Sequence, residues 1–163
     1  MRYIVKNKFL SPTGSSKILD EDGKLAYKVK GRFFSITKKK RICDLEGNVL
    51  FTVKNKWFNW INHTAYVFNA DGEQIGVITR NKYGVKNRYT LEEFEDEIEI
   101  KGDFFSVTLD VLVNKARKAI ISREFSFFVD KFSLETEDVG NVPLYLALVI
   151  AIDNLGDKRR KEK

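Results

Sequence analysis

The sequence predicts a mainly β (α+β) protein, a closed antiparallel β-barrel of about twelve strands around one buried C-terminal hydrophobic helix. Three observations lead to this prediction. Residues 142–152 are apolar or aromatic without interruption. A hairpin motif occurs three times in the first half of the chain. Many of the remaining apolar residues alternate with polar ones, as they do in half-buried strands.

The hairpin motif occurs at 20–23, 44–47 and 69–72, so the copies are 24 and 25 residues apart. Each copy ends in glycine, which adopts the positive φ of a tight turn without strain. An apolar, extended segment follows each copy. The motif therefore predicts a β-hairpin each time, and this period fits an antiparallel meander better than a solenoid.

Basic residues follow the hairpin motifs in a regular way. An apolar residue precedes two basic residues spaced two apart and then an aromatic, as in Val53-Lys54-Asn55-Lys56-Trp57. Positions two apart on a strand face the same side. Lys54 and Lys56 are therefore predicted to share a face, and so are Arg80 and Lys82. The cluster at 38–41 is predicted to lie at the end of another hairpin.

The outer segments of the chain continue the pattern. Residues 2–9 alternate loosely before a turn-rich stretch at 11–16, which predicts a first strand and a loop. Residues 107–113 alternate as a strand does, and 114–117 is interpreted as a turn before further strands. The acidic segment 91–97 is interpreted as a short helical turn.

The apolar segment 142–152 is interpreted as a helix, with a buried strand as the alternative. Its alanines and leucines favour a helix, Pro143 suits a first turn, and Asn141 is a plausible N-cap. Eleven residues span only about 17 Å of helix, whereas a bilayer core needs about 30 Å. The predicted buried residues of this helix are Leu144, Leu146, Leu148, Val149, Ile150 and Ile152.

A helix that is apolar on all sides must be covered on all sides. A barrel wide enough to hold the helix would cover it completely. The alternative is a two-sheet sandwich with the helix outside, which would leave leucines in water. Asp153 then stands at the unfavourable end of the helix dipole, where we expect an ion pair with a basic residue or a place in a polar pocket at the barrel rim.

Composition indicates one globular domain, residues 1–156, followed by a basic tail, residues 157–163, that is expected to be disordered. The net charge of +6 favours anionic partners, although solubility alone can explain such a charge. The chain has one cysteine and no apolar run at its N-terminus. These features predict a cytoplasmic protein without a transmembrane segment. The oligomeric state is left open.

The residue inventory gives little support for catalysis or a cofactor. The sequence contains no P-loop and no G-x-G-x-x-G motif. One histidine and one cysteine exclude a multi-His or multi-Cys metal site. His63 lies near no nucleophile signature, and Cys43 is interpreted as a core residue. We therefore predict a protein that is not an enzyme and that holds no metal or cofactor.

Several segments match a known family: 2–9, the hairpin motifs, 31–36, 100–104, 121–126 with 130–132, and 146–153. On these residues the chain resembles the LURP-one-related family, within the tubby C-terminal-domain-like superfamily, as a bacterial-type member. The resemblance implies a twelve-stranded, mostly antiparallel barrel threaded by the C-terminal helix. Tubby domains bind phosphoinositides, but no tubby lipid-binding motif matches here residue by residue. The cysteine cluster of the related phospholipid scramblases is absent.

The resemblance and the charge pattern suggest a binding module that attaches to anionic phospholipid, or to a phosphorylated small ligand, through basic barrel rims. The alternative is a nucleic-acid-binding protein that uses the same charges with aromatics such as Trp60 and Tyr83. Nucleic acid ranks lower because no RNA-binding signature is present. The candidate ligand-binding residues are Lys38, Lys39, Lys40, Arg41, Lys54, Lys56, Trp57, Arg80 and Lys82.

Overall fold

The computed structural model describes residues 1–6, 15–31, 36–57, 63–81, 89–102, 107–124 and 131–155. Trp60, Lys82, Tyr83 and the predicted tail 157–163 lie outside these residues. The strands are β1 (Arg2–Lys6), β2 (Ser16–Leu19), β3 (Leu25–Gly31), β4 (Lys40–Cys43), β5 (Val49–Asn55), β6 (His63–Phe68), β7 (Gln74–Arg80), β8 (Tyr89–Glu92), β9 (Ile98–Lys101), β10 (Thr108–Val113), β11 (Ala116–Glu124) and β12 (Lys131–Thr136). A 3₁₀-helix, η1 (Val139–Asn141), leads into α1 (Val142–Leu155).

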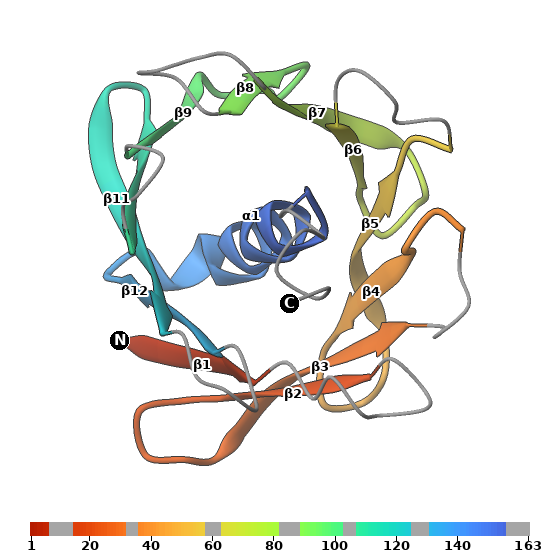
Figure 1. The fold of residues 1–163 in the computed structure, drawn as a ribbon. Coiled ribbons are helices and arrows are strands. Elements are labelled where there is room, and N and C mark those ends of the chain that lie inside the picture. The colour runs from red at the N-terminus through yellow and green to blue at the C-terminus, as the bar shows by residue number, and fades with distance from the viewer. Residues whose placement is uncertain are drawn as a thin grey trace, which may run out of the picture.

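The strands form one antiparallel sheet that curls into a barrel around α1 (Figure 1). The order of strands in the sheet follows the chain from β1 to β8, and β1 also pairs with β12, which continues the sheet to β9. β8 and β9 lie next to each other, and within the described residues no hydrogen-bonded ladder joins them. The predicted fold class is therefore confirmed, as a nearly closed antiparallel barrel of 12 strands with one central helix.

The three hairpin motifs connect β2 to β3, β4 to β5 and β6 to β7 with one geometry. In each, the first side chain of the motif accepts a hydrogen bond from a backbone N–H four residues on, as Asp44 Oδ1 does from Asn48 at 2.8 Å. The glycines have φ of 77°, 97° and 85°, and each preceding strand contains a register shift. Asp and Asn both fit the first position because both provide the acceptor oxygen.

Two predictions for the second half have different outcomes. Asn114 and Lys115 form the turn between β10 and β11, with φ of 50° and 69°, the pattern of a type I′ turn. The predicted helical turn at 91–97 is wrong, because β8 extends to Glu92 and no helix follows before β9. The ring of Phe94 instead packs against Gly76, where a Cβ would overlap it. So short a helix has little stability of its own, and this packing decides the conformation.

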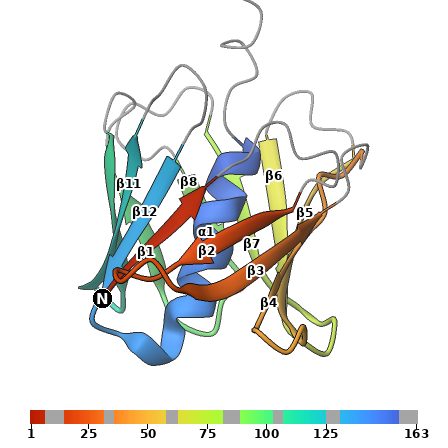
Figure 2. The ribbon, with the colours of Figure 1, turned by 90° about the horizontal axis from the view of Figure 1, so that it is seen from below.

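The barrel has two ends, and α1 runs from one to the other (Figure 2). The end that we call the turn end holds the tight connections 20–24, 44–48, 69–73, 93–97 and 114–115, and the chain enters α1 there. The opposite end, which we call the loop end, includes the last residues of β3, β5 and β7 and the C-terminus of α1. These two ends differ in charge and in how they hold the helix.

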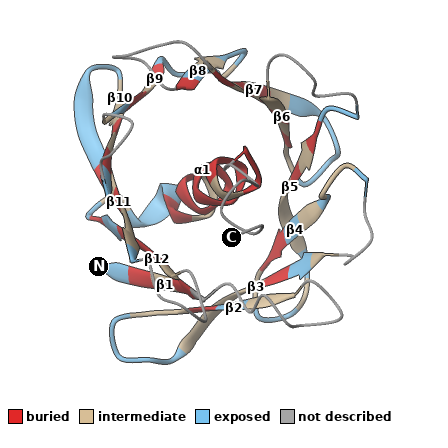
Figure 3. Ribbon diagram, viewed as in Figure 1, coloured by how far each residue is buried: buried red, intermediate tan, exposed pale blue. Residues whose placement is uncertain are grey.

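Helix α1 is covered on every side (Figure 3). All of its residues are buried except Pro143, Leu144 and Asp153, which are half-buried, and Leu144 still packs against the core. The helix packs most closely against β5 and β6. It continues three residues past the predicted end at Ile152, to Leu155. The segment is thus a helix and not a strand, and the barrel, not a sandwich, covers it.

Candidate functional site

Three side chains at the loop end bind the backbone carbonyls at the C-terminus of α1. Lys38 Nζ donates to the carbonyl oxygen of Asn154 at 2.7 Å, and Asn55 Nδ2 donates to the same oxygen at 3.3 Å. The buried Arg80 donates through Nη1 to the carbonyl oxygen of Leu155 at 3.0 Å. The last carbonyls of a helix lack intrahelical partners and carry partial negative charge. The two cations therefore stabilise the helix end.

Asp153 lies in the last turn of α1 and forms an ion pair. Lys40 Nζ is 3.2 Å from Asp153 Oδ2, and both side chains are 22% exposed. A carboxylate is unfavourable beside the negative end of a helix dipole. The ammonium group of Lys40 offsets this cost, so the predicted pairing of Asp153 with a basic residue is present.

The basic residues after the hairpins divide between the two faces of the barrel wall. Val53 and Ile78 are buried in the core, and Asn55 and Arg80, which follow them by two positions, are buried as well. Lys54 lies between Val53 and Asn55 and therefore faces outward. Similar sequence patterns thus place Arg80 inside the barrel and Lys54 outside it. Lys82, the predicted companion of Arg80, lies outside the described residues.

Six basic side chains lie on the outer surface of β2 to β5 and on the residue that follows β5, and we call them the basic wall: Lys17, Lys28, Lys30, Arg41, Lys54 and Lys56. They alternate along the strands with residues buried in the core. The β2–β3 ladder places Lys17 opposite Lys28, and the β3–β4 ladder places Lys30 opposite Arg41. Like charges directly opposite each other destabilise a sheet. The stability of the sheet therefore does not explain this arrangement.

No member of the basic wall forms an ion pair with a carboxylate in the part of the chain that the structure describes. Lys28 Nζ donates to the carbonyl oxygen of Leu45 at 2.8 Å. The ammonium group of Lys54 lies 4.5 Å from the centre of the Phe68 ring, a cation–π contact. Across the barrel, by contrast, Arg117 lies 3.6 Å from a carboxylate oxygen. The wall therefore offers positive charge to an anion from outside.

Sequence reasoning found three members of the basic wall and missed Lys17, Lys28 and Lys30. The sequence signal that could have found the missed residues is the alternation of basic with apolar residues along β2 and β3. Lys28 and Lys30 flank the buried Val29, and Lys17 precedes the buried Ile18, so all three belong on the outer face. Only the strand ladders bring them next to the predicted residues.

Two large apolar side chains, Ile36 and Trp57, project at the loop end beside the basic wall, and we call them the apolar tip. Ile36 is 74% exposed and Trp57 is 64% exposed. Their segments are adjacent, because the backbone N–H of Asn55 donates to the carbonyl oxygen of Thr37 at 2.6 Å. Lys39, a further predicted site residue, is exposed on the same segment. The tip thus places apolar surface next to cations.

The turn end holds the helix through a carboxylate. Tyr145 Oη donates to Asp138 Oδ2 at 2.7 Å, and Asn141 Nδ2 donates to the same oxygen at 3.0 Å. The hydrogen bonds from Asn141 and Tyr145 lower the pKa of Asp138. Burial, with the nearby carboxylate, raises the pKa of Tyr145 well above its usual value. Asn141 directly precedes α1, at the position predicted for the N-cap, and its side-chain amide donates to Asp138.

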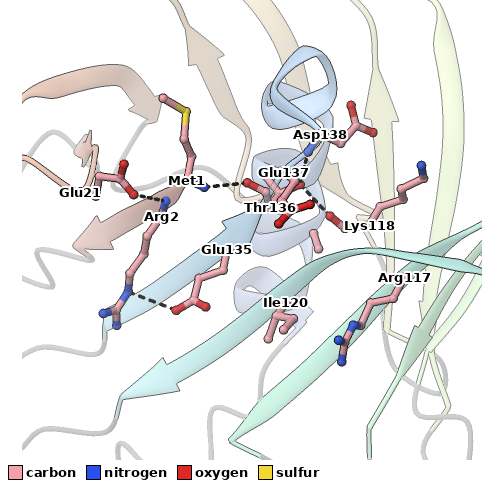
Figure 4. A pocket seen from close by; sticks show the side chains of 11 residues that line it. Met1, Arg2, Glu21, Arg117, Lys118, Ile120, Glu135, Thr136, Glu137 and Asp138 are labelled. Atoms are coloured by element: carbon pink, nitrogen blue, oxygen red, sulfur yellow. Dashed lines mark hydrogen bonds and ion pairs between the residues drawn. The ribbon is translucent and has the colours of Figure 1, made fainter.

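A hollow of about 860 Å³ lies near this contact, beside β1, β11 and β12 (Figure 4). Acidic and basic side chains line it together. The amino group of Met1 donates to the carbonyl oxygen of Thr136 at 2.9 Å, and Arg2 Nε lies 3.4 Å from Glu135. Because these charges neutralise one another, the hollow does not favour one class of charged ligand.

Other chemistry has little support in the structure. Cys43 is fully buried, in agreement with its interpretation as a core residue. His63 is partly exposed and lies opposite Arg80 in the β6–β7 ladder. The described residues contain no group of three or more His, Cys, Asp or Glu side chains suited to a metal ion. Within the same residues, α1 is too short to be a membrane-spanning helix, and no other helix qualifies.

Comparison with known proteins agrees with this architecture. A family model described as LURP-one-related matches residues 1–153. The fold is similar to an X-ray structure of an Arabidopsis thaliana protein, with a TM-score of 0.57, 15% sequence identity, and coverage of 93% of this chain and 91% of that chain. No curated protein matches the sequence. The likeness in structure supports the fold alone, and the family match over nearly the whole sequence shows that the chain belongs to the LURP-one-related family.

Proposed function

We propose that this chain is a non-enzymatic binding module whose basic wall binds phosphate-bearing anions, either phospholipid headgroups or phosphorylated small molecules. The observation that carries the proposal is the pairing of like charges on the outer surface. Lys17 opposes Lys28, and Lys30 opposes Arg41, without a carboxylate partner in the described residues. A bound anion would relieve the repulsion that this arrangement creates.

The spacing of the wall suits phosphate groups. Neighbouring strands lie about 5 Å apart, and residues two apart on one strand are separated by about 7 Å. Flexible lysine side chains, joined by Arg41, can therefore converge on one phosphate from two strands. The proposed site lies on the wall and not at the inner rim, because Lys38, Lys40 and Arg80 already serve the end of α1.

Nucleic acid is the second candidate, and the surface supports it less well. Single strands bind where bases stack on exposed aromatic rings along a basic groove. On the strands beside the wall, the aromatic residues Tyr66 and Phe68 are half-buried, and Trp57, next to Lys56, is the one exposed aromatic ring of the described residues at its edge. The outer faces of β2 to β5 form the convex outside of the barrel (Figure 1). These features leave little room for stacking.

The test measures binding to vesicles and to a soluble polyphosphate. We expect the protein to float with phosphatidylglycerol vesicles, but not with phosphatidylcholine vesicles, or to bind inositol hexakisphosphate in calorimetry. The triple variant Lys30→Gln, Arg41→Gln and Lys56→Gln should bind about 100-fold more weakly, because each basic residue near an anionic surface contributes about 1 kcal/mol. The control variant Lys101→Gln, Arg117→Gln and Lys118→Gln removes the same charge from β9 and β11.

The outcomes separate the alternatives. The proposal is supported if the wall variant loses binding while the control variant keeps it. The probe that binds, vesicle or inositol hexakisphosphate, identifies the source of the phosphate. An equal loss in both variants, or no binding of either probe by the unmodified protein, removes it. Tighter binding to a labelled single-stranded oligonucleotide than to both probes would favour the nucleic-acid candidate instead.

A further inference from the structure

We infer that the apolar tip enters the interfacial zone of an anionic lipid bilayer and so orients the barrel with its loop end toward the membrane. This inference rests on the proposed function and makes it specific, since it commits the phosphate to a lipid headgroup. The carrying observation is the juxtaposition of Ile36 and Trp57 with the basic wall at one end of the barrel.

Exposure of the tip is the first step of the argument. Single exposed apolar residues are ordinary on protein surfaces. Ile36 and Trp57 are the two most exposed large apolar residues in the described part of the chain, at 74% and 64%, and they project from adjacent segments. A free phosphorylated ligand needs no apolar side chains. A bilayer interface offers both an apolar layer and a layer of phosphates.

The chemistry of the tip fits that interface. Tryptophan is enriched where hydrocarbon meets headgroups, because the indole ring is apolar and its N–H can still donate to a polar group. Lys56 directly precedes Trp57 and is exposed, so its ammonium group would lie at the level of the phosphates when the indole ring enters. The long lysine stems of the wall can also cover apolar surface while their charges remain in water.

Charge at the other end of the barrel supports the choice of the loop end. The turn end also exposes apolar residues, Met1, Leu45 and Val139. The basic side chain next to Met1, that of Arg2, lies within ion-pair distance of Glu124 and Glu135. Leu45 lies between Asp44 and Glu46, and Val139 directly follows Asp138. An anionic bilayer would repel these segments, whereas the apolar tip has cations beside it. Electrostatics therefore selects one of two ends that both carry exposed apolar groups.

The experiment uses the fluorescence of Trp57 as the reporter, in the chain of residues 1–163. The chain has two tryptophans, so Trp60→Phe leaves Trp57 as the only one. We expect the emission of Trp57 to shift to shorter wavelength on addition of phosphatidylglycerol vesicles and to be quenched by brominated lipids. Inositol hexakisphosphate should produce neither change. Circular dichroism before and after the substitution checks that the barrel is intact.

A second pair of variants tests affinity. Ile36→Ser combined with Trp57→Ser should weaken binding to phosphatidylglycerol vesicles about tenfold, because the apolar contribution to interfacial binding is lost. Any binding of inositol hexakisphosphate should be unchanged. Val139→Ser, at the turn end, is the matched control and should bind vesicles like the unmodified protein.

The results that overturn the inference differ from those that overturn the proposed function. Vesicle binding that depends on the basic wall while the emission of Trp57 stays unchanged removes the insertion but keeps the function. If Val139→Ser weakens vesicle binding as much as the tip variant does, the insertion of the apolar tip is also removed. Self-association in analytical ultracentrifugation that disappears with the tip variant would assign the tip to a contact between copies. No binding to vesicles or polyphosphate removes both proposals.

Discussion

The two ends of the barrel hold the same helix by opposite means. At the turn end, the carboxylate of Asp138 accepts a hydrogen bond from Tyr145 close to the N-terminus of α1. At the loop end, Lys38 and Arg80 donate to the carbonyls of the C-terminus. Each arrangement matches the helix dipole, which favours negative charge at the N-terminus and positive charge at the C-terminus.

This difference shows that charge in the protein serves two purposes. The cations that face inward at the loop end are committed to the helix, while those of the basic wall face outward and have no carboxylate partner in the described residues. A count of basic residues does not separate the two groups. The direction of each side chain relative to the barrel wall does separate them. Three changes test this comparison of the two ends.

The largest effect is expected from Arg80→Met, which keeps an unbranched apolar stem and removes the donor to Leu155. A buried carbonyl without its partner costs about 1–3 kcal/mol of the free energy of unfolding. The measurement is urea denaturation followed by circular dichroism. Arg117→Met is the control at an exposed ion pair, where little change is expected. Equal losses for both variants would contradict the assignment of Arg80 to the helix end.

A smaller effect is expected from Tyr145→Phe at the turn end. At neutral pH the variant should lose about 1 kcal/mol in the free energy of unfolding, because the hydrogen bond to Asp138 is removed. The folded pKa of Asp138 is lowered relative to about 3.9 in the unfolded chain. The stabilisation by the carboxylate is therefore complete above that value and is lost as pH falls through the folded pKa.

Denaturation curves at a series of pH values check this prediction. The stability difference between the unmodified protein and the Tyr145 variant should shrink at acid pH. Tyr27→Phe is the control, because it also removes a tyrosine hydroxyl, but from a ring that packs near Tyr3 and not from the donor to Asp138. A difference for Tyr145→Phe that stays constant through the acid range would show that packing, and not the carboxylate, holds this end.

The smallest effect concerns charge at long range. Neutralising Glu95, Glu97 and Glu137 to glutamine at the turn end should change vesicle binding less than about twofold at 0.15 M salt, where the Debye length is about 8 Å. A strand of seven residues such as β5 already spans about 20 Å. At about 0.01 M salt the same variant should bind vesicles more tightly than the unmodified protein does, because weaker screening lets the removed negative charges act over a longer distance. A large change at 0.15 M salt would place the anion site near the turn end.

Local patterns were enough to predict much of the fold. The hairpin motifs predicted three turns because a glycine with positive φ and an acceptor side chain act within five residues. The apolar segment at 142–152 predicted a covered helix because no side of it tolerates water. The helical turn at 91–97 was predicted wrongly, because contact between Phe94 and Gly76 joins segments that no local pattern relates.

The candidate site could be predicted only in part. Alternation along each strand separates inward from outward residues, and it correctly joined Lys54 with Lys56. It could not show that Lys17 stands opposite Lys28, since the register between strands depends on the β-bulges beside the turns. The partners of Lys38 and Arg80 lie more than 70 residues away in the chain.

The sequence by itself determined the elements of this protein: short strands joined by glycine turns, and one helix that must be enclosed. These follow from forces that act between neighbours in the chain and from the exclusion of apolar surface from water. Only the tertiary structure decided which cations serve the helix and which face solvent. That choice depends on strand register and on closure of the barrel, which bring distant residues together and set whether a basic side chain points toward the end of the helix or away from the barrel.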